Sequence, residues 1–338
     1  MKKLISISIF LTLISGGILL NAQSNYKIAR QIKVEGQGGW DYITVDENTG
    51  RLYISHGTVA QIVDIKTGTL VGTIPDTKGI HGVAIATDLN KGFTSNGRDT
   101  SVTVFDLKTL AVTGKIKVTG QNPDAILYDA NTHKLFTFNG RSSNATVIDA
   151  ATNTVLSTIP LAGKPEFPQS DSKGKIFVNI EDKSMISVIN TNTLSVEKSW
   201  SIAPGEEPSG LALDVKTHRL FSVCDNKLMV VSDAEAGKVI TTLPIGSRCD
   251  GVAFDPGLKR AYSSNGEGTI TVVQEENKDS FKVLETIKTQ AGARTIAVDK
   301  TTHKLYLPTA EFEGPNGENR RPAIKPNSFV VLEVELAK

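Results

Sequence analysis

One sequence pattern occurs seven times along the chain. In each copy a residue, usually aspartate, is followed seven positions later by tyrosine or phenylalanine, and the copies start 40–44 residues apart. Clear copies start at Asp46, Asp129, Asp214, Asp255 and Asp299, and weaker copies start at Ala86 and Ser170. A period of this length indicates that the fold stacks one supersecondary unit repeatedly.

Each repeat predicts four short strands and no helix. An apolar strand such as YITV ends at the aspartate, a polar turn follows, and the second strand starts at the aromatic residue, as at Tyr53. A third, β-branched strand such as QIVDI from Gln61 precedes a D-x-x-T turn and a fourth strand that ends in TIP or TLPIG. Four strands in about 40 residues are typical of a β-propeller blade. We therefore predict an all-β, seven-bladed β-propeller with four-stranded blades.

The two ends of the chain predict how the ring closes. Residues 30–36 repeat the pattern of residues 114–120, which form a fourth strand and its exit loop. The last repeat offers only one strand after Tyr306, over residues 328–334. We expect the N-terminal strand to complete the last blade, because this removes an open sheet edge. Residues 23–338 then form a single propeller domain.

The repeats resemble those of the YVTN family. The second strands read FTSN from Phe93, FTFN from Phe136 and YSSN from Tyr262, and the D-x-x-T turns and TIP endings also fit. The similarity covers residues 26–338 and extends to the YncE-like exported seven-bladed propellers. It implies an architecture and a periplasmic address. It implies no catalytic residues, because the family has no single chemistry.

Residues 1–22 predict export. Lys2 and Lys3 precede an uncharged apolar run from Leu4 to Leu20, and Ala22 is a small residue at the expected cleavage position. This is the pattern of a secretory signal peptide, and an uncleaved membrane anchor is the alternative. We expect a periplasmic or secreted monomer with no membrane span after cleavage.

The composition excludes several classes of protein. Lysine and arginine number 37 against 36 acidic residues, so the overall charge does not indicate binding to nucleic acid or to a membrane surface. Two cysteines and no C-x-x-C-H sequence exclude a disulfide-dense scaffold, a four-cysteine zinc site and covalent c-type haem.

The candidate binding residues are those that break the repeat. In a propeller, the fourth-to-first and second-to-third loops share one face around the mouth of the central channel, where rigidly held loops build binding sites. These loops carry polar and charged residues at Asp41, His56, His81, Asp124, Glu166, Asp250, Arg294, Arg98 and Arg141. We predict that an unidentified small molecule or protein binds at this channel mouth.

Two interpretations of these residues stay open. Imidazole and carboxylate groups from successive blades can hold a divalent metal or perform acid–base chemistry, and the candidates for this are His56, His81, Asp41 and Asp124. Alternatively, the residues form a solvated polar rim held by ion pairs to Arg98 and Arg141. No cofactor other than this possible metal is predicted.

Three functions follow from these interpretations. The main prediction is a non-catalytic scaffold that binds a ligand or partner at the channel mouth. The alternative is a metal-dependent lactonase or lyase-type enzyme with Asp41, His81 and Asp250 at its centre. A propeller that carries a redox cofactor, such as d1 haem or a quinone, is the third, and fold similarity alone does not choose among them.

Two further features belong to the same face. Residues 308–327 form a long loop rich in proline, glycine and charge, which we expect to cover the mouth as a lid or docking arm through Phe312, Arg320 and Arg321. Cys224 and Cys249 lie in two loops that meet there, and an oxidising compartment favours a disulfide between them. Free thiols, or a metal site with Asp225 and Asp250, are the alternatives.

Overall fold

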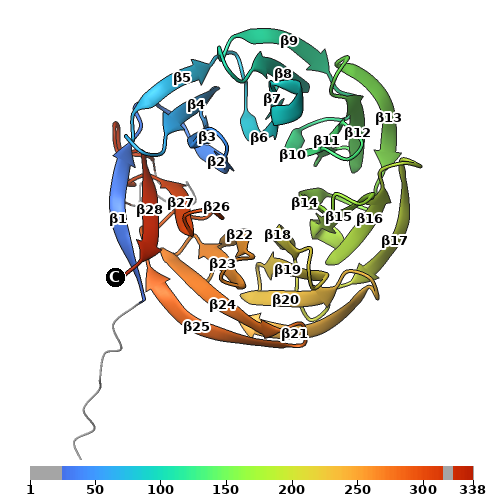
Figure 1. Ribbon diagram of the computed structural model, residues 1–338, viewed down its shortest axis with the longest axis vertical. Helices are drawn as coiled ribbons and strands as arrows, with labels where there is room; N and C mark the ends of the chain where they lie inside the picture. Colours follow the sequence, from blue (N-terminus) through green and yellow to red (C-terminus); the bar gives the residue numbers. More distant parts are fainter. Residues whose placement is uncertain (1–24, 315–322, 338) are drawn as a thin grey trace, which may run out of the picture.

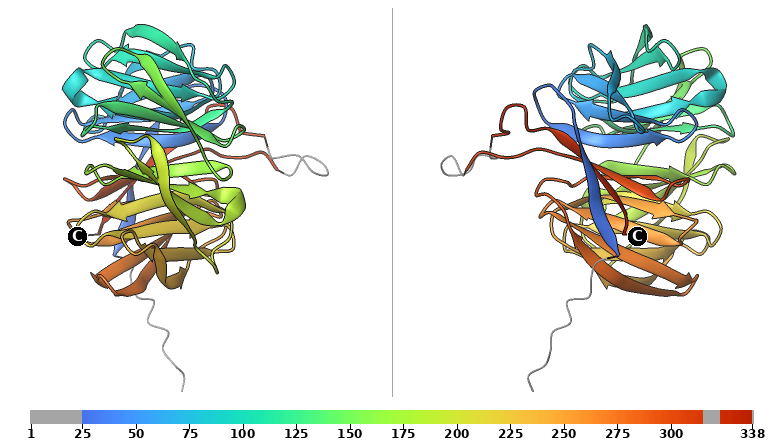
Figure 2. Two further views of the ribbon diagram at one scale, coloured as in Figure 1. Left: turned by 90° about the vertical axis from the view of Figure 1, so that its right-hand side faces the viewer. Right: turned by 60° about the vertical axis from the view of Figure 1, so that its left-hand side comes forward.

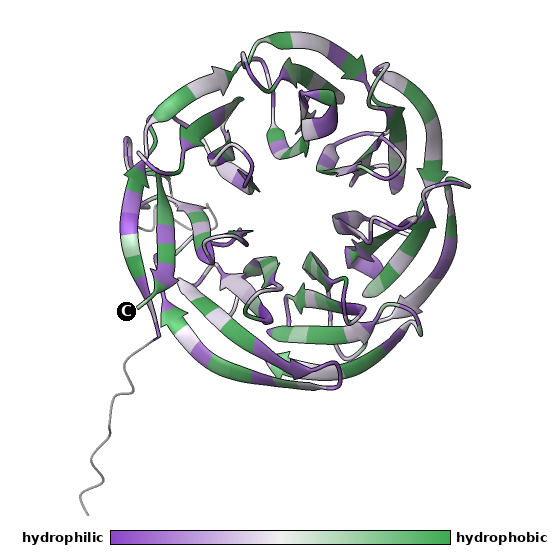
Figure 3. Ribbon diagram, viewed as in Figure 1, coloured by the Kyte–Doolittle hydropathy of each residue, from purple (hydrophilic) through white to green (hydrophobic). Residues whose placement is uncertain are grey.

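The computed structural model describes residues 25–314 and 323–337, and it forms a closed ring of seven four-stranded antiparallel sheets (Figure 1). The predicted seven-bladed propeller is confirmed. Apolar and polar segments alternate along the strands of the ring (Figure 3). No helix among the described residues is long and apolar enough to cross a membrane.

Every blade runs from the channel outward. The innermost strands are β2 (Trp40–Asp46), β6 (Ile80–Ala86), β10 (Pro123–Asp129), β14 (Pro165–Ser170), β18 (Pro208–Asp214), β22 (Cys249–Asp255) and β26 (Ala297–Asp299). The second strands are β3 (Arg51–His56), β7 (Lys91–Asn96), β11 (Lys134–Asn139), β15 (Lys175–Ile180), β19 (Arg219–Cys224), β23 (Arg260–Asn265) and β27 (Lys304–Thr309).

The outer half of each blade completes the sheet. The third strands are β4 (Val59–Asp64), β8 (Ser101–Asp106), β12 (Asn144–Asp149), β16 (Met185–Asn190), β20 (Leu228–Asp233), β24 (Thr269–Asn277) and β28 (Val330–Leu336). The outermost strands are β5 (Leu70–Ile74), β9 (Val112–Lys117), β13 (Thr154–Pro160), β17 (Ser195–Ser201), β21 (Lys238–Pro244), β25 (Ser280–Lys288) and β1 (Tyr26–Lys33). The short 3-10 helices η1 (Thr87–Leu89) and η2 (Glu181–Lys183) lie in loops.

The repeat in the sequence matches the blades residue by residue. All seven repeat starts are the last residue of an innermost strand, as Asp46 is of β2. The second strands begin two residues before the aromatic residue, at a lysine or arginine such as Arg51, rather than at the aromatic residue as expected. The aromatic side chains are buried, and Tyr53 packs with Val83 and Phe105 of the next blade. These residues therefore form the apolar contact between blades.

The turns explain the other repeated residues. In the D-x-x-T turn after β4, a carboxylate oxygen of Asp64 accepts the backbone N–H of Thr67 at 2.7 Å. His133, His218 and His303 lie in the turns between first and second strands with φ between 52° and 60°, a left-handed conformation. These turns face away from the channel mouth, so the repeated aspartates and histidines have structural roles.

The ring closes as the two chain ends predicted. β1 pairs antiparallel with β28, from Tyr26 opposite Leu336 to Lys33 opposite Val330. Figure 1 shows the N-terminal strand lying beside the C-terminal one as the outermost strand of the seventh blade. The hydroxyl of Tyr26 also lies 2.9 Å from that of Tyr262, so β1 contacts the sixth blade as well.

A buried carboxylate joins the strands at the closure. Glu333 on β28 is 3% exposed. It accepts Nε of Arg30 from β1 at 3.0 Å and Nζ of Lys304 from β27 at 2.5 Å. Its charge is therefore paired on both sides, which offsets the cost of removing a carboxylate from water.

We expect Glu333→Gln to lower the free energy of unfolding by about 1–3 kcal/mol, because it leaves Arg30 and Lys304 without their shared anion. Urea denaturation measures the change. The matched control is Lys27→Ala, which breaks the exposed Lys27–Glu335 pair across the same two strands and costs less than about 0.5 kcal/mol. Equal stability of Glu333→Gln and the wild type would contradict this role.

Candidate functional site

The polar residues of the channel mouth occupy one equivalent position in the blades. This position is the second residue of the innermost strand, and it is occupied by Asp41, His81, Asp124, Glu166, Ser209 and Asp250. In the seventh blade, Arg294 precedes β26. β14 is one residue shorter than β6 or β10, so Glu166 rather than Pro165 takes this position. We call these seven residues the mouth ring.

A local irregularity in the strands positions the mouth ring. The pairing of β2 with β3 shifts register between Trp40 and Ile43. Similar register shifts occur near the first residues of β6, β10, β14, β18 and β22. Bulges of this kind redirect a side chain. Hydroxyl groups stabilise the bulge: Ser55 accepts the backbone N–H of Asp41 at 2.9 Å, and Thr295 donates to the carbonyl of Asp41 at 2.6 Å.

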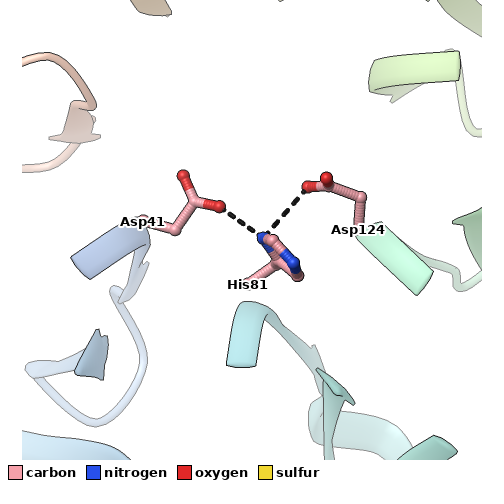
Figure 4. Close-up of side chains that lie close together, drawn as sticks. All are labelled: Asp41, His81 and Asp124. Atoms are coloured by element: carbon pink, nitrogen blue, oxygen red, sulfur yellow. Dashed lines mark hydrogen bonds and ion pairs between the residues drawn. The ribbon is translucent and has the colours of Figure 1, made fainter. Parts of the chain in front are cut away.

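His81 lies between two carboxylates from the neighbouring blades (Figure 4). Its Nδ1 donates to Asp41 at 2.6 Å and lies 3.4 Å from Asp124. Burial alone lowers the pKa of His81, but the hydrogen bond to Asp41 and the charges of both aspartates outweigh it and raise the pKa to about 9. The imidazole is therefore protonated at neutral pH.

The next pair in the ring is acidic and largely buried. Burial, and then repulsion by Asp124, raises the pKa of Glu166, which is 8% exposed. Burial likewise raises the pKa of Asp124, although the charge of His81 opposes the shift. Nζ of Lys164 lies 2.7 Å from Glu166 and also pairs with Glu181. Two cations, His81 and Lys164, therefore flank this acidic pair.

Arg294 completes the network across the closure of the ring. Its guanidinium group pairs with Asp41 at 3.2 Å and with Asp250, and it donates to the carbonyl of Trp40 at 2.8 Å. The predicted ion pairs to Arg98 and Arg141 are absent from the described residues, where both side chains are exposed. His81, Lys164 and Arg294 neutralise the ring instead, because their side chains point into the channel mouth.

His56 does not join the ring, which corrects the predicted metal set. It is the last residue of β3, where other blades bury an asparagine such as Asn96. His56 is 2% exposed, its Nδ1 donates to Gln61 at 2.6 Å, and its ring stacks on Phe329 at 3.9 Å between centroids. It replaces a structural amide that bonds within the blade, so it faces away from His81.

Asp41, His81 and Asp124 remain as a set that could hold a metal ion. Their ligand atoms lie within 4.8 Å of one another. Two features oppose metal binding: Nδ1 of His81 already donates to Asp41, and Arg294 pairs with the other oxygen of Asp41. A metal ion bound between these residues would therefore have to displace the proton on Nδ1 of His81 and the ion pair between Asp41 and Arg294.

A cavity of about 910 Å³ adjoins the mouth ring at the first, sixth and seventh blades. It is lined by Gly39, Trp40, Arg248, Asp250, Gly266, Ala291, Gly292, Arg294, Phe312 and Ile324. The last two come from the long loop, whose described parts project from one side of the ring (Figure 2). Phe312 pairs with Ile324 as an isolated β-bridge. Arg320 and Arg321 lie outside the described residues, so the loop's course over the channel stays a prediction.

Two residues of this region, Lys164 and Trp40, were not among the predicted site residues. Lys164 stands two positions before Glu166 in the run Lys-Pro-Glu, and a lysine so close to a candidate acid was a usable signal. Trp40 directly precedes Asp41, but its role depends on Phe312, which is 272 positions away in the chain. No local pattern could have indicated that contact.

The predicted disulfide is not formed in the structure. Cys224 and Cys249 are free and buried, and they lie close together. The thiol of Cys249 donates to the carbonyl of Cys224 at 3.1 Å, whereas Sγ of Cys224 faces the carbonyl of Ser222 at 3.9 Å. Each sulfur thus has a backbone oxygen as its hydrogen-bond partner. Burial raises the pKa of both thiols to about 12.

Comparisons with known proteins show the fold. No protein-family model matches the chain, and no curated protein matches it. The structure is similar to that of U3-55K, with a TM-score of 0.74 and 12% identity over 90% of this chain and 97% of that one. The WD40 repeats of RRP9 align with a TM-score of 0.74 and 11% identity over the same shares.

A third similar structure is hydrazine synthase of Kuenenia stuttgartiensis. It has a TM-score of 0.69 and 17% identity, and the alignment covers 81% of this chain and 94% of that one. At these identities the likeness concerns architecture alone. The chain therefore has the fold of a seven-bladed propeller with WD40-repeat neighbours.

We expect Asp124→Asn to lower the pKa values of both Glu166 and His81. Glu166 loses a like charge that disfavours its ionised form, and His81 loses an opposite charge that favours its protonated form. NMR titration of the side-chain carboxyl and imidazole signals measures both shifts. Asp88→Asn, on the opposite face, is the control and leaves both values in place. Unchanged titrations in Asp124→Asn would show that the ring is not electrostatically connected.

Proposed function

We propose that this protein is a non-catalytic binding propeller whose ligand or partner lies at the channel mouth. The observation that carries the proposal is the mouth ring itself. Polar side chains from every blade occupy one equivalent position, whereas the repeated residues elsewhere have structural partners. A rigid scaffold that converges different polar groups on one opening is suited to recognition.

The existing pairs of donors and acceptors in the ring favour a role in binding. A general base needs an accessible nitrogen or carboxylate with a pKa near the working pH. Burial raises the pKa of Asp124 to about 6 and that of Glu166 to about 7, so this pair meets the pKa condition, but Glu166 is buried and paired with Lys164. His81 is protonated at neutral pH and donates to Asp41, and Arg294 and Lys164 pair with the acidic residues. These groups are preorganised as hydrogen-bond donors and acceptors for a polar ligand.

A ligand panel of amines, carboxylates, sugars and short peptides tests this proposal by thermal shift and calorimetry. We expect at least one compound to raise the melting temperature of the wild type and to lose its effect in His81→Gln/Asp124→Asn. At one hundred times its Kd, a ligand adds about 2.7 kcal/mol of stability. His133→Gln/Asp88→Asn makes the same exchange on the opposite face and keeps binding. Ligands that bind both double variants equally well would place the site elsewhere.

A metal-dependent lactonase or lyase-type enzyme is the second candidate, supported by the close approach of Asp41, His81 and Asp124. The same panel therefore includes zinc, copper and calcium salts, each titrated by calorimetry. The enzyme proposal requires one metal ion per chain in the wild type and none in His81→Gln/Asp124→Asn. Absence of metal binding by the wild type would exclude a metal-dependent mechanism at this set.

We further propose that the protein is exported and acts in the periplasm or outside the cell. The pattern of residues 1–22 and the resemblance to YncE-like propellers of the YVTN family support this address. Residues 1–24 lie outside the described part of the chain. Fractionation of cells that express the full chain, with N-terminal sequencing, should give a periplasmic form starting at Gln23. A full-length form in the membrane fraction would favour an uncleaved anchor.

A further inference from the structure

The cavity beside the mouth ring has one aromatic wall, which the long loop completes. Trp40 and Phe312 lie with ring centroids 6.0 Å apart, and Ile324 packs in the same apolar cluster. Gly292 permits this arrangement, because a Cβ atom there would lie 2.7 Å from the ring of Phe312. Two segments far apart in the sequence thus form an apolar wall beside a polar opening.

Two arginines also line the cavity. Arg248 and Arg294 flank Gly266, where an added Cβ atom would lie 3.2 Å and 3.5 Å from their respective Cβ atoms. Arg294 is already neutralised by Asp41 and Asp250. Arg248 is exposed, and its guanidinium group has no hydrogen bond or ion pair among residues 25–314 and 323–337. Among the described residues, the cavity lining therefore includes one unpaired positive charge in addition to its aromatic wall.

We propose that this cavity binds a small aromatic carboxylate. Its ring would lie against Trp40 and Phe312, and its carboxylate would pair with Arg248. The cavity, at about 910 Å³, is of the size that small-molecule sites have. A guanidinium group matches a carboxylate in charge and in its planar pair of donors. This inference rests on the proposed binding function and specifies its ligand class.

Two probes of equal shape separate charge from apolar contact: 2-naphthoate is an anion, and 2-naphthamide is its neutral counterpart. Calorimetry should show that the wild type binds 2-naphthoate about tenfold more tightly than 2-naphthamide. In Arg248→Ala this preference should disappear while the affinity for 2-naphthamide stays the same. Arg98→Ala removes another exposed arginine, which does not line the cavity, and should leave both affinities unchanged.

Gly39 allows the cavity to be filled directly. It lines the cavity, and a Cβ atom there would meet no other atom within 4 Å. Gly39→Phe should therefore abolish binding of both probes, with circular dichroism confirming its fold. Phe312→Ala, which removes only the aromatic wall, should weaken both probes about equally and serves if Gly39→Phe does not fold.

The proposal is overturned if the wild type binds neither probe, if Arg248→Ala keeps the preference for 2-naphthoate, if folded Gly39→Phe still binds the probes, or if Phe312→Ala binds them as tightly as the wild type. These outcomes are distinct from failure of the proposed function. A panel ligand that depends on His81 and Asp124, together with no naphthoate binding, would retain the mouth ring as the site and remove this cavity from it.

Discussion

Each blade has two apolar faces, and only a neighbouring blade can cover them. Buried aromatic residues such as Tyr53 pack across these contacts, and every blade needs a neighbour on both sides. An open row of blades would leave two faces and a sheet edge exposed to water. The rest of the structure therefore depends on ring closure, where β1 pairs with β28 and Glu333 joins Arg30 to Lys304.

Ring closure also creates the polar mouth. Asp41 and Arg294 are 253 positions apart in the chain, yet they form an ion pair because the first and seventh blades are neighbours in the ring. The same adjacency places Trp40 beside Phe312 of the long loop. The cavity and the Arg294–Asp41 pair of the charge network thus exist only in the closed propeller. A weakened closure would therefore affect recognition as well as stability.

Residues that recur from blade to blade build the scaffold, whereas residues that vary between blades form the mouth ring. Repeated aspartates form turns, repeated aromatics form the core, and asparagines such as Asn96 bond inside their own blades. The mouth ring lies where the strands bulge, so its side chains do not form the turns, the core or the hydrogen bonds within a blade. Polar identity can vary there from blade to blade without loss of the scaffold, which is why the position can carry a specific set of charges.

The sequence by itself determined the architecture. The spacing of aspartates and aromatic residues predicted the number of blades and the ends of their inner strands. The unpaired strands at the two ends predicted closure, because strand patterns are local and an open edge is unfavourable. It also indicated most of the mouth ring, since those positions break the repeat.

Only the tertiary structure decided which of these residues meet. His56 turned into its own blade because it replaces a buried asparagine, and the shorter β14 moved Glu166 into the ring. Cys224 and Cys249 came together with their thiols aimed at carbonyl groups. Arg248 came to line the same cavity as Trp40 and Phe312, with no partner among the described residues. Side-chain direction, strand bulges and contacts across the ring depend on packing between distant segments, so a one-dimensional pattern does not specify them.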